Sequence, residues 1–403
     1  MVTVAGRVWA RPDAVAAGML LLLAAAGLAQ RQLGLVPGLV TVAAWSAVVV
    51  AVVRWALLSA GGPRIPVTAI TVLLTAGLVA LAAVNLLVPE SVDLRADRDD
   101  ALDLAAAELM GGRDPWAVST HIHPTHHPSP GLGGVLLAAP FALGLGDSSW
   151  QNVFWLMIAV VLLVRVAGWA PALAGAALVW SSPTFWNEWI FQSDLLVLGI
   201  KFVVAGLWGL HAMARSQWPA RVLSALLFGL VLADRFLFLC FALLIAAVAL
   251  RRIPWRRCVP WLVLAAITAL ALLIAPLAWA PAYLDQMTLN LAKGSEAAGG
   301  AATFAGPALG VVLLVLALVS GLRSRQDIEV MGAAALLCAV VVGWQVLLYS
   351  WSAGAPTFDG TLAVAYTPLM LITGVAALVL PQGNAVTGVV YAGSREQVAE
   401  HVG

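Results

Sequence analysis

The stretch PVTAITVLLTAGLVALAAVNLLV, at residues 66–88, carries no charged side chain and decides the class of fold. A helix needs about 20 apolar residues to cross the hydrocarbon core of a membrane. Backbone polar groups cannot stay unpaired in lipid, so such a stretch is expected to be α-helical. The strands of an outer-membrane barrel would alternate polar and apolar residues, and this stretch does not alternate. We therefore predict a transmembrane helix here.

Comparable stretches recur along the chain, and the composition agrees with them. Of the 403 residues, 62% are hydrophobic and only 10% are charged, too few charges to cover a soluble protein of this length. An all-α, polytopic membrane bundle of about 10–13 transmembrane or re-entrant helices is expected. The predicted spans are 12–29, 36–60, 66–88, 150–167, 170–182, 195–213, 259–280, 304–322, 328–350 and 360–380.

Arginines between the spans predict the orientation, because basic residues concentrate in short loops on the inner side. Arg7 and Arg11 place the N-terminus inside, and three spans then place the loop after residue 88 outside. The remaining basic clusters are expected inside: Arg215 and Arg221, then Arg251, Arg252, Arg256 and Arg257, then Arg323 and Arg325. The number of membrane crossings agrees with this orientation if 132–146 is re-entrant and 222–250 is a hairpin of two short helices.

This orientation divides the chain into four regions. Residues 1–88 are N-terminal transmembrane helices, and residues 89–131 are an extracytoplasmic loop rich in acidic residues and histidine. Residues 132–380 are a transmembrane core with re-entrant segments, and residues 381–403 are a cytoplasmic tail. No basic tract indicates a nucleic-acid partner. The cysteines Cys240, Cys258 and Cys338 lie in or beside apolar segments and form no disulfide framework or metal-type spacing.

The outer loop reads LRADRDDALDLAAAELMGGRDPW at residues 94–116. The run Asp100–Met110 predicts a short amphipathic helix, capped by Asp99 or Asp100 and ended by the following glycines. Its apolar side, which comprises Leu102, Leu104, Ala105 and Leu109, is expected to lie on the membrane surface. Carboxylates at the mouth of the spans, here Asp97, Asp99 and Asp100, could act as a general base or hold a divalent cation. Simple helix capping is the alternative for any one of them.

An acidic residue in the first large outer loop, followed by an Ala/Leu helix and GRDPW, resembles the GT-C glycosyltransferases. The similarity is to the glycosyltransferase family 87 type, the polyprenyl-phosphate-mannose-dependent mannosyltransferases of actinobacteria. The matching run is Asp97 or Asp99, Ala105–Met110, Gly112 and then Asp114-Pro115-Trp116, with Trp116 where the family has Tyr. HPSPGLGGVLLAAPF, at 127–141, and GDSSWQNVFW, at 146–155, resemble the segments that follow in the family. Three predicted spans precede the loop here, whereas the family usually has one.

The resemblance implies a GT-C-like fold and an outer-loop aspartate as catalytic base. The resemblance assigns that role to Asp97 or Asp99, with Asp100 as the third candidate. Arg98, beside them, is a candidate for substrate binding. Four of the six histidines, His121, His123, His126 and His127, follow in the same loop. By analogy with the family, His123, His126 and His127 could hold a phosphate or a sugar. A cluster of histidines like this could also bind a metal, or it could simply be part of a polar loop.

Two further groups are expected on the same side. Trp186, Glu188 and Trp189 form the run WNEW before Asp194, and Trp rings either stack on sugars or belong to an interfacial belt. Asp234 and Arg235 interrupt an apolar run, where charges are costly and are expected to be paired or near a cavity. Arg235 suits a lipid phosphate because its guanidinium is a bidentate donor. The alternative is an Asp234–Arg235 pair that holds the hairpin turn.

The preferred hypothesis is inverting sugar transfer from a polyprenyl-phosphate donor that carries mannose or another hexose or pentose. The acceptor is an extracytoplasmic lipid or glycan. The enzyme is expected to be a multi-pass protein of the cell membrane, in contact with membrane lipids, and to bind no nucleic acid. No cofactor is firmly implied, although a divalent cation is compatible with the acidic loop. The alternatives are a transporter or flippase of lipid-linked or small substrates, and a noncatalytic membrane scaffold.

Overall fold

The computed structural model supports an α-helical membrane protein. It describes residues 40–41, 43–45, 47–48, 51, 67–87, 98–120, 127–214, 217–235, 238–286, 288, 302–354 and 366–380. Within these ranges the regular structure is helical, without a β-strand. In this described part of the chain, five helices are long and apolar enough to cross a membrane. The prediction of an all-α, multi-pass membrane bundle is confirmed at this level.

The observed helices follow the predicted spans closely. The five long helices are α4 (Val67–Leu87), α8 (Trp150–Ala167), α11 (Asp194–Ala214), α14 (Trp255–Ile274, continued by the 3₁₀ turn η1 at Ala275–Ala278) and α17 (Asp327–Ala353). Three more predicted spans correspond to α9 (Trp169–Trp180), α16 (Ala302–Arg323) and α19 (Thr367–Val379). The predicted span 12–29, most of 36–60 and the tail 381–403 lie outside the described residues.

Two predicted spans differ from the structure at their ends. Helix α14 begins at Trp255, four residues before the predicted start, so that Arg256 and Arg257 belong to its first turn. Helix α19 has 13 residues, and at about 1.5 Å per residue it is too short to cross the hydrocarbon core alone. A short apolar helix of this kind must be covered by its neighbours, and α17, α11 and α9 pack against it.

The two remaining apolar segments, 132–146 and 222–250, form short helices, which was predicted for the second of them. Residues 132–146 give α7 (Leu132–Leu145), and residues 222–250 divide into α12 (Trp218–Leu232) and α13 (Phe238–Arg252). Asp234 and Arg235 lie in the connection between α12 and α13. The Arg257 guanidinium, just after α13, donates 2.9 Å to the Ala214 carbonyl, just before α12. Both ends of the α12–α13 pair therefore lie at the same end of the bundle, and the hairpin is confirmed.

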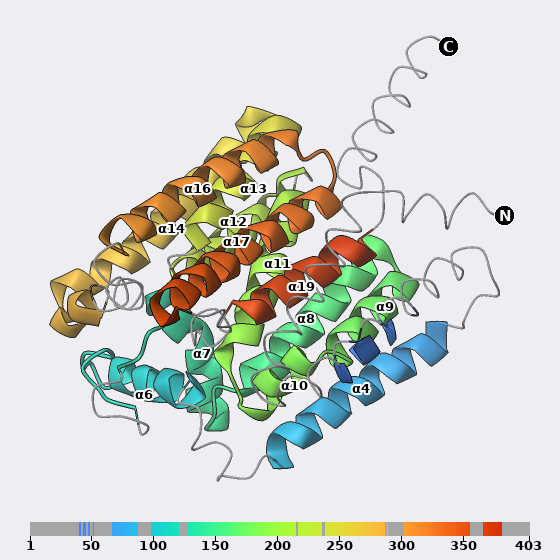
Figure 1. The fold of residues 1–403 in the computed structure, drawn as a ribbon, viewed down its shortest axis with the longest axis horizontal. Helices are drawn as coiled ribbons and strands as arrows, with labels where there is room; N and C mark the ends of the chain where they lie inside the picture. The colour runs from blue at the N-terminus through green and yellow to red at the C-terminus, as the bar shows by residue number, and fades with distance from the viewer. Residues whose placement is uncertain are drawn as a thin grey trace.

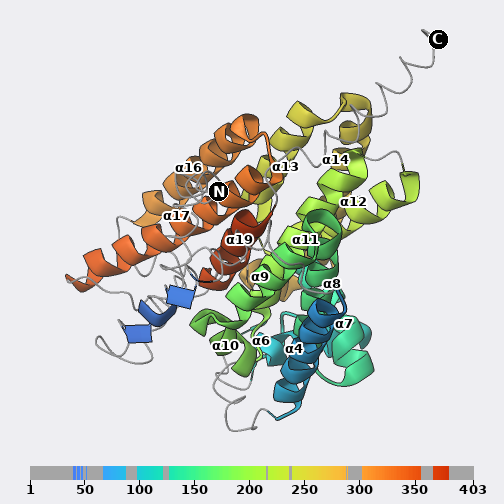
Figure 2. The ribbon, with the colours of Figure 1, turned by 90° about the vertical axis from the view of Figure 1, so that its right-hand side faces the viewer.

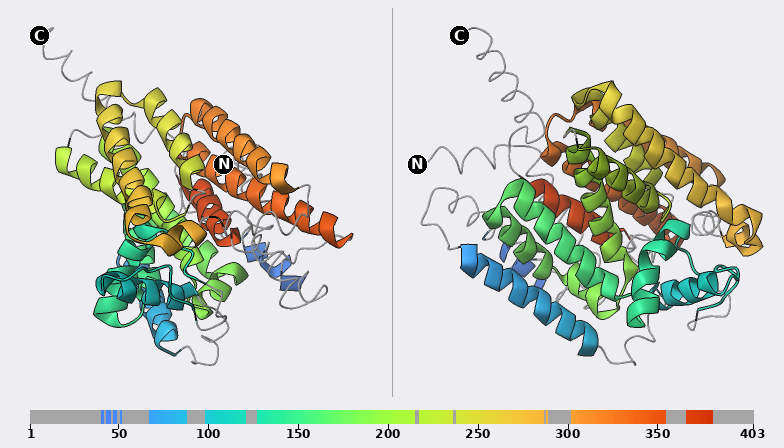
Figure 3. Two further views of the ribbon diagram at one scale, coloured as in Figure 1. Left: turned by 90° about the vertical axis from the view of Figure 1, so that its left-hand side faces the viewer. Right: turned by 180° about the vertical axis from the view of Figure 1, so that it is seen from behind.

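The helices form a layered array with two distinct ends. Figure 1 shows α14 and α16 at one margin, α4 at the other, and α11, α17 and α19 between them. Figures 2 and 3 show α6 (Arg98–Met110), α7 and α10 (Pro183–Ile190) toward one end and the α13–α14 junction toward the other. We call the first the loop end and the second the basic end.

Contacts at the basic end join loops that are distant in sequence. Arg252 donates 2.8 Å to the Asp327 carboxylate and 3.3 Å to the Ser324 carbonyl. The ring of His211 lies 3.2 Å from the second oxygen of Asp327. The segments that follow α11, α13 and α16 therefore meet on one side, as the distribution of arginines predicted.

The outer-loop helix α6 spans Arg98–Met110, which begins two residues before the predicted start. Asp99 and Asp100 therefore lie in its first turn, and the expectation that one of them is the N-cap was wrong. Carboxylates in a first turn still complement the positive end of the helix dipole. Its buried side chains Leu102 and Ala105 pack against Val135 of α7. The apolar side of α6 thus covers another helix, because α7 offers a neighbouring apolar surface within the protein.

Candidate functional site

A buried ion pair lies at the turn between α12 and α13. The Lys201 ammonium, in the second turn of α11, is 3.4 Å from one carboxylate oxygen of Asp234. Their side chains are 1% and 2% exposed, so that water screens neither charge. Charges buried in a membrane protein are costly unless they are paired, which explains why these two residues lie together.

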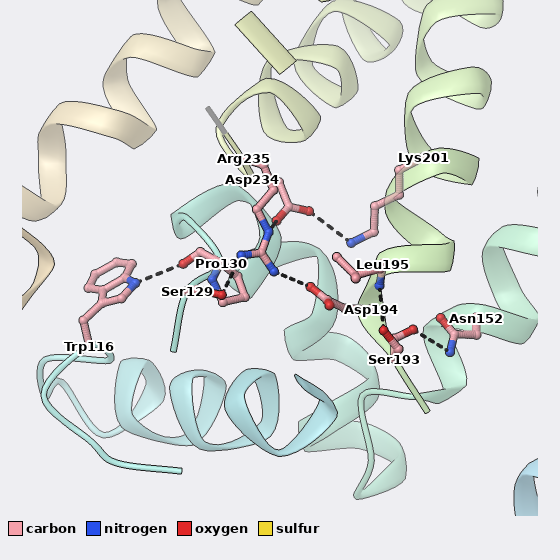
Figure 4. A network of polar contacts seen from close by, with 10 residues as sticks. All are labelled: Trp116, Ser129, Pro130, Asn152, Ser193, Asp194, Leu195, Lys201, Asp234 and Arg235. Atoms are coloured by element: carbon pink, nitrogen blue, oxygen red, sulfur yellow. Dashed lines mark hydrogen bonds and ion pairs between the residues drawn. The ribbon is translucent and has the colours of Figure 1, made fainter. Parts of the chain in front are cut away.

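Arg235, the next residue, has different partners. One guanidinium nitrogen donates 2.7 Å to Asp194 at the start of α11, and another donates 2.6 Å to the Ser129 hydroxyl (Figure 4). Its third nitrogen is 4.0 Å from Asp234, at the limit of an ion pair. The expected alternative of an Asp234–Arg235 pair is therefore not the main arrangement, because each residue binds more closely to α11. The Arg235 side chain is 21% exposed, which is more than the side chains of its charged neighbours Asp194, Lys201 and Asp234.

The N-terminus of α7 packs tightly against this turn. The Gly131 amide donates 2.8 Å to the Asp234 carbonyl. A Cβ on Gly133 would lie 2.0 Å from the Leu230 carbonyl oxygen, and a Cβ on Gly134 would lie 2.2 Å from an Asp234 carboxylate oxygen. Only glycine permits this approach. The carboxylate of Asp234 consequently faces the positive end of the α7 dipole as well as Lys201.

The GRDPW run, residues 112–116, binds the outer loop to the helical bundle. One oxygen of Asp114 accepts the Trp116 amide at 2.9 Å, and the other accepts the Ala282 amide at 3.0 Å. The indole of Trp116 donates 3.0 Å to the Pro130 carbonyl and packs 4.4 Å from the Tyr283 ring. Asp114 and Trp116 therefore position the segment that delivers Ser129 to Arg235.

An acidic residue of the loop helix α6 binds the segment just before α8. Asp103 accepts the Ser148 amide at 2.8 Å, which joins α6 to the start of α8. Burial, followed by repulsion from Asp147 and Asp100, raises the pKa of Asp103 to about 7 from an ordinary 3.8, although its bonds to Ser148 oppose the shift. This carboxyl group therefore exchanges its proton near neutral pH.

The structure describes only some of the other predicted loop residues. Asp97, His121, His123 and His126 lie outside the described residues. The backbone of Arg98 and Asp99 forms the start of α6, and the Asp100 side chain is partly exposed one turn before Asp103. His127 is described: one ring nitrogen lies 2.9 Å from the Val118 carbonyl, which folds the loop on itself. The described part of the chain holds no group of three His, Cys, Asp or Glu suited to a metal.

The WNEW run lies on α10, at the loop end. The indole of Trp186 is partly exposed and donates 2.6 Å to the Trp180 carbonyl. Glu188 is buried, and its carboxylate accepts a hydrogen bond from the side-chain amide of Asn187 at 3.0 Å. Trp189 is buried and donates 3.1 Å to the Leu81 carbonyl of α4. The indole hydrogen bonds of Trp186 and Trp189 join α10 to α9 and α4, whereas Asp194, only a few residues later, binds Arg235 directly.

Sequence reasoning missed Lys201, Ser129 and Asp103. The signal for Lys201 was present, because it is the only Asp, Glu, Lys or Arg in the apolar stretch 195–213. A lone charge within a span indicates a buried partner. Ser129 and Asp103 carried no comparable signal, since a loop serine or a helical aspartate is ordinary on its own.

These features define a multi-pass helical membrane protein with a buried ionic network at one end of its bundle, next to a folded loop. The sequence matches no protein-family model, and neither a curated protein nor a solved structure matches it.

Proposed function

We propose that this chain is a membrane glycosyltransferase that transfers a sugar from a polyprenyl-phosphate donor to an extracytoplasmic acceptor at the cell membrane. In this proposal the loop end faces outward. The observation that carries it is the Arg235 guanidinium, held by Asp194 and Ser129 and partly exposed beside the acidic loop. A fixed, forked donor of this kind suits a phosphate group.

The reaction would proceed by inversion. Asp97 or Asp99, with Asp100 as the third candidate, removes the proton of an acceptor hydroxyl. The acceptor oxygen then attacks the anomeric carbon, a new glycosidic bond forms, and the bond from that carbon to the phosphate oxygen breaks. Arg235 stabilises the negative charge on the departing polyprenyl phosphate. A lipid-linked donor gives a physical reason for embedding the enzyme in the membrane.

The resemblance to the family 87 type, which extends over about residues 65–255, supports this assignment. Two features of the structure agree with the resemblance: the Asp-Pro-Trp run closes the loop, and the segment after it enters the bundle as α7. Both features bring the loop next to Arg235.

The decisive variant is Arg235→Lys. Lysine keeps the positive charge but loses the forked geometry, so donor affinity and transfer are expected to fall while the protein still folds. Arg113→Lys is the matched control, because Arg113 makes an exposed ion pair with Glu108 in the same loop. Purified variants would be tested for binding and turnover of polyprenyl-phosphate-mannose. Unchanged donor affinity in Arg235→Lys would refute the phosphate role.

The loop carboxylates need their own test. Asp97→Asn, Asp99→Asn and Asp100→Asn would be compared for transfer at equal protein levels. Loss of a general base lowers the rate by about 10²- to 10⁴-fold. Full activity in all three variants would remove the proposed base.

One observation favours the rival class. Lys201 lies within a membrane-spanning helix and is paired with Asp234, and buried charges of this kind also mark ion or substrate pathways in transporters. Reconstituted vesicles distinguish the two classes. A transporter moves a lipid-linked or small substrate without forming a glycosidic bond, whereas the transferase yields a glycosylated acceptor.

A further inference from the structure

A buried polar cluster lies beside Asp194, around the N-terminus of α8. Asn85 of α4 donates 3.0 Å to the Ser149 hydroxyl, and Gln192 donates 3.4 Å to the Asn85 carbonyl. Asn152 donates 3.4 Å to the Ser193 carbonyl. Figure 4 shows Asn152 and Ser193 next to Asp194, which carries Arg235 on its other side. Three separate segments therefore meet at this point.

In the described part of the chain, the side-chain donors of this cluster have hydrogen-bond partners, whereas several side-chain acceptors do not. The amide nitrogens of Asn85 and Asn152 are used, as described above. Their side-chain oxygens, together with Oδ1 of Asp194, have no hydrogen-bond partner among the residues that the structure describes. All three residues are buried. A buried acceptor without a partner is unfavourable, and such a group in a folded protein points to a missing donor.

These acceptors belong to one neighbourhood. Ser149 and Asn152 are three residues apart at the start of α8, so their side chains lie on one face. Asn85 contacts the first of them, and Ser193 contacts the second. Asp194 follows Ser193 directly. The side-chain oxygen of Gln151, at the adjacent position of α8, is likewise buried without a partner in the described chain.

We propose that Asn85, Asn152 and Asp194 form a subsite for the hydroxyl groups of a glycosyl unit. Asp194 links the two halves of the ligand, because its Oδ2 holds Arg235 and its Oδ1 is directed to a sugar hydroxyl. This inference rests on the proposed function, and it deepens that function by assigning the residues that recognise the sugar. One glycosyl phosphate would thus bind Arg235 through its phosphate and Asp194 through a hydroxyl of its sugar.

Charge favours a hydroxyl ligand over a metal cation. Amide and carboxylate oxygens also bind hard cations. However, the Asp194 carboxylate already lies 2.7 Å from the Arg235 guanidinium, which neutralises it and repels a second cation. Sugar hydroxyls supply the missing hydrogens without adding charge.

The test compares two lipids, polyprenyl-phosphate-mannose and the same polyprenyl phosphate without sugar. Wild type is expected to bind the mannosylated lipid more tightly. Asn85→Leu and Asn152→Leu are expected to weaken that binding about tenfold each, since each removes a hydrogen bond, and to leave binding of the bare phosphate lipid unchanged. Thr373→Val is the control, because the Thr373 hydroxyl is buried and satisfied by the Leu369 carbonyl at 2.8 Å. If wild type binds both lipids and binds them equally tightly, the subsite is overturned.

A second measurement needs no variant and separates this inference from the donor assignment. Saturating free mannose, glucose or arabinose should slow hydrogen exchange in wild type at residues 149–152 and 192–195. Protection by a free sugar with no binding of either lipid would retain the subsite and refute the polyprenyl-phosphate donor. Protection by Na⁺, measured against a choline background and absent with every sugar, would overturn the hydroxyl assignment. Absence of protection by every probe, together with equal binding of the two lipids, would overturn it as well.

Discussion

Lys201 and Asp234 show how the protein accommodates charge inside an apolar bundle. Their mutual attraction is useful only while both are present, because each would be a buried, unpaired charge without the other. The 3.4 Å separation and the near-complete burial of both side chains place them in this class. The pair is therefore expected to behave as one unit in mutagenesis.

Lys201→Met is predicted to destabilise the protein by about 3–5 kcal/mol, because Asp234 is left buried without its cation. Lys201→Met combined with Asp234→Asn is predicted to recover most of that loss, since no lone charge remains. The measurement is unfolding in mixed detergent micelles, followed by tryptophan fluorescence. A double variant no more stable than the single one would show that the two charges are not coupled.

Asp103 predicts a pH dependence of stability. Its pKa of about 7 in the folded protein exceeds the ordinary 3.8, so the folded state binds more protons than the unfolded state between those values. Stability is therefore expected to fall as the pH rises from about 4 to about 7. Asp103→Asn keeps an oxygen acceptor for the Ser148 amide and cannot ionise, so its stability should change less with pH. The measurement is Tm of both proteins from pH 4.5 to 7.5, and an unchanged slope in the variant would exclude Asp103 as the source.

At the scale of elements, the short helix α7 depends on its glycines. Its first turn touches the backbone of α12 and the Asp234 side chain, and a methyl group on Gly133 would overlap the Leu230 carbonyl at 2.0 Å. The tight approach positions the turn that carries Arg235. The GLGG run is thus a packing feature of the site, although the site charges are on other elements.

Gly133→Ala is predicted to lower stability by about 1–3 kcal/mol, because the overlap must be relieved by moving α7 or α12. Gly144→Ala, in the last turn of the same helix, is the control, since a Cβ there meets nothing within 4 Å. Thermal unfolding of the two variants and wild type provides the comparison. Equal melting temperatures for the two variants would contradict the close contact.

At the scale of the whole molecule, the two ends of the bundle differ in charge and in structure. Loops rich in arginine meet at the basic end, where Arg252 and His211 both contact Asp327. The folded loop, the ionic network and the buried polar cluster all lie at the opposite end. This separation predicts one orientation in the membrane.

The orientation is tested by placing single cysteines in a background that lacks Cys240, Cys258 and Cys338. A cysteine at Ser119 is predicted to react with an impermeant thiol reagent added outside intact cells. A cysteine at Ser216 is predicted to react only after the membrane is opened, because the neighbouring Arg215 and Arg221 predict that this part of the sequence faces the inside. The opposite pattern would reverse the topology and place the site inside.

Local information in the sequence was sufficient for most of the long helices. Apolar length predicted α4, α8, α11 and α17 to within a few residues, and the interruption at Asp234 predicted the α12–α13 hairpin. The distribution of arginines correctly grouped the loops of the basic end. These features depend on the cost of exposing a backbone or a charge to lipid, which each segment meets by itself.

The partners of the charges were decided only by the tertiary structure. Lys201 meets Asp234 across 33 residues, and Asp194 meets Arg235 across 41, although Asp234 and Arg235 are neighbours in the chain. Packing likewise turned the apolar side of α6 toward α7. Such pairings depend on how helices cross and on which glycines allow close approach, and no local pattern encodes that geometry.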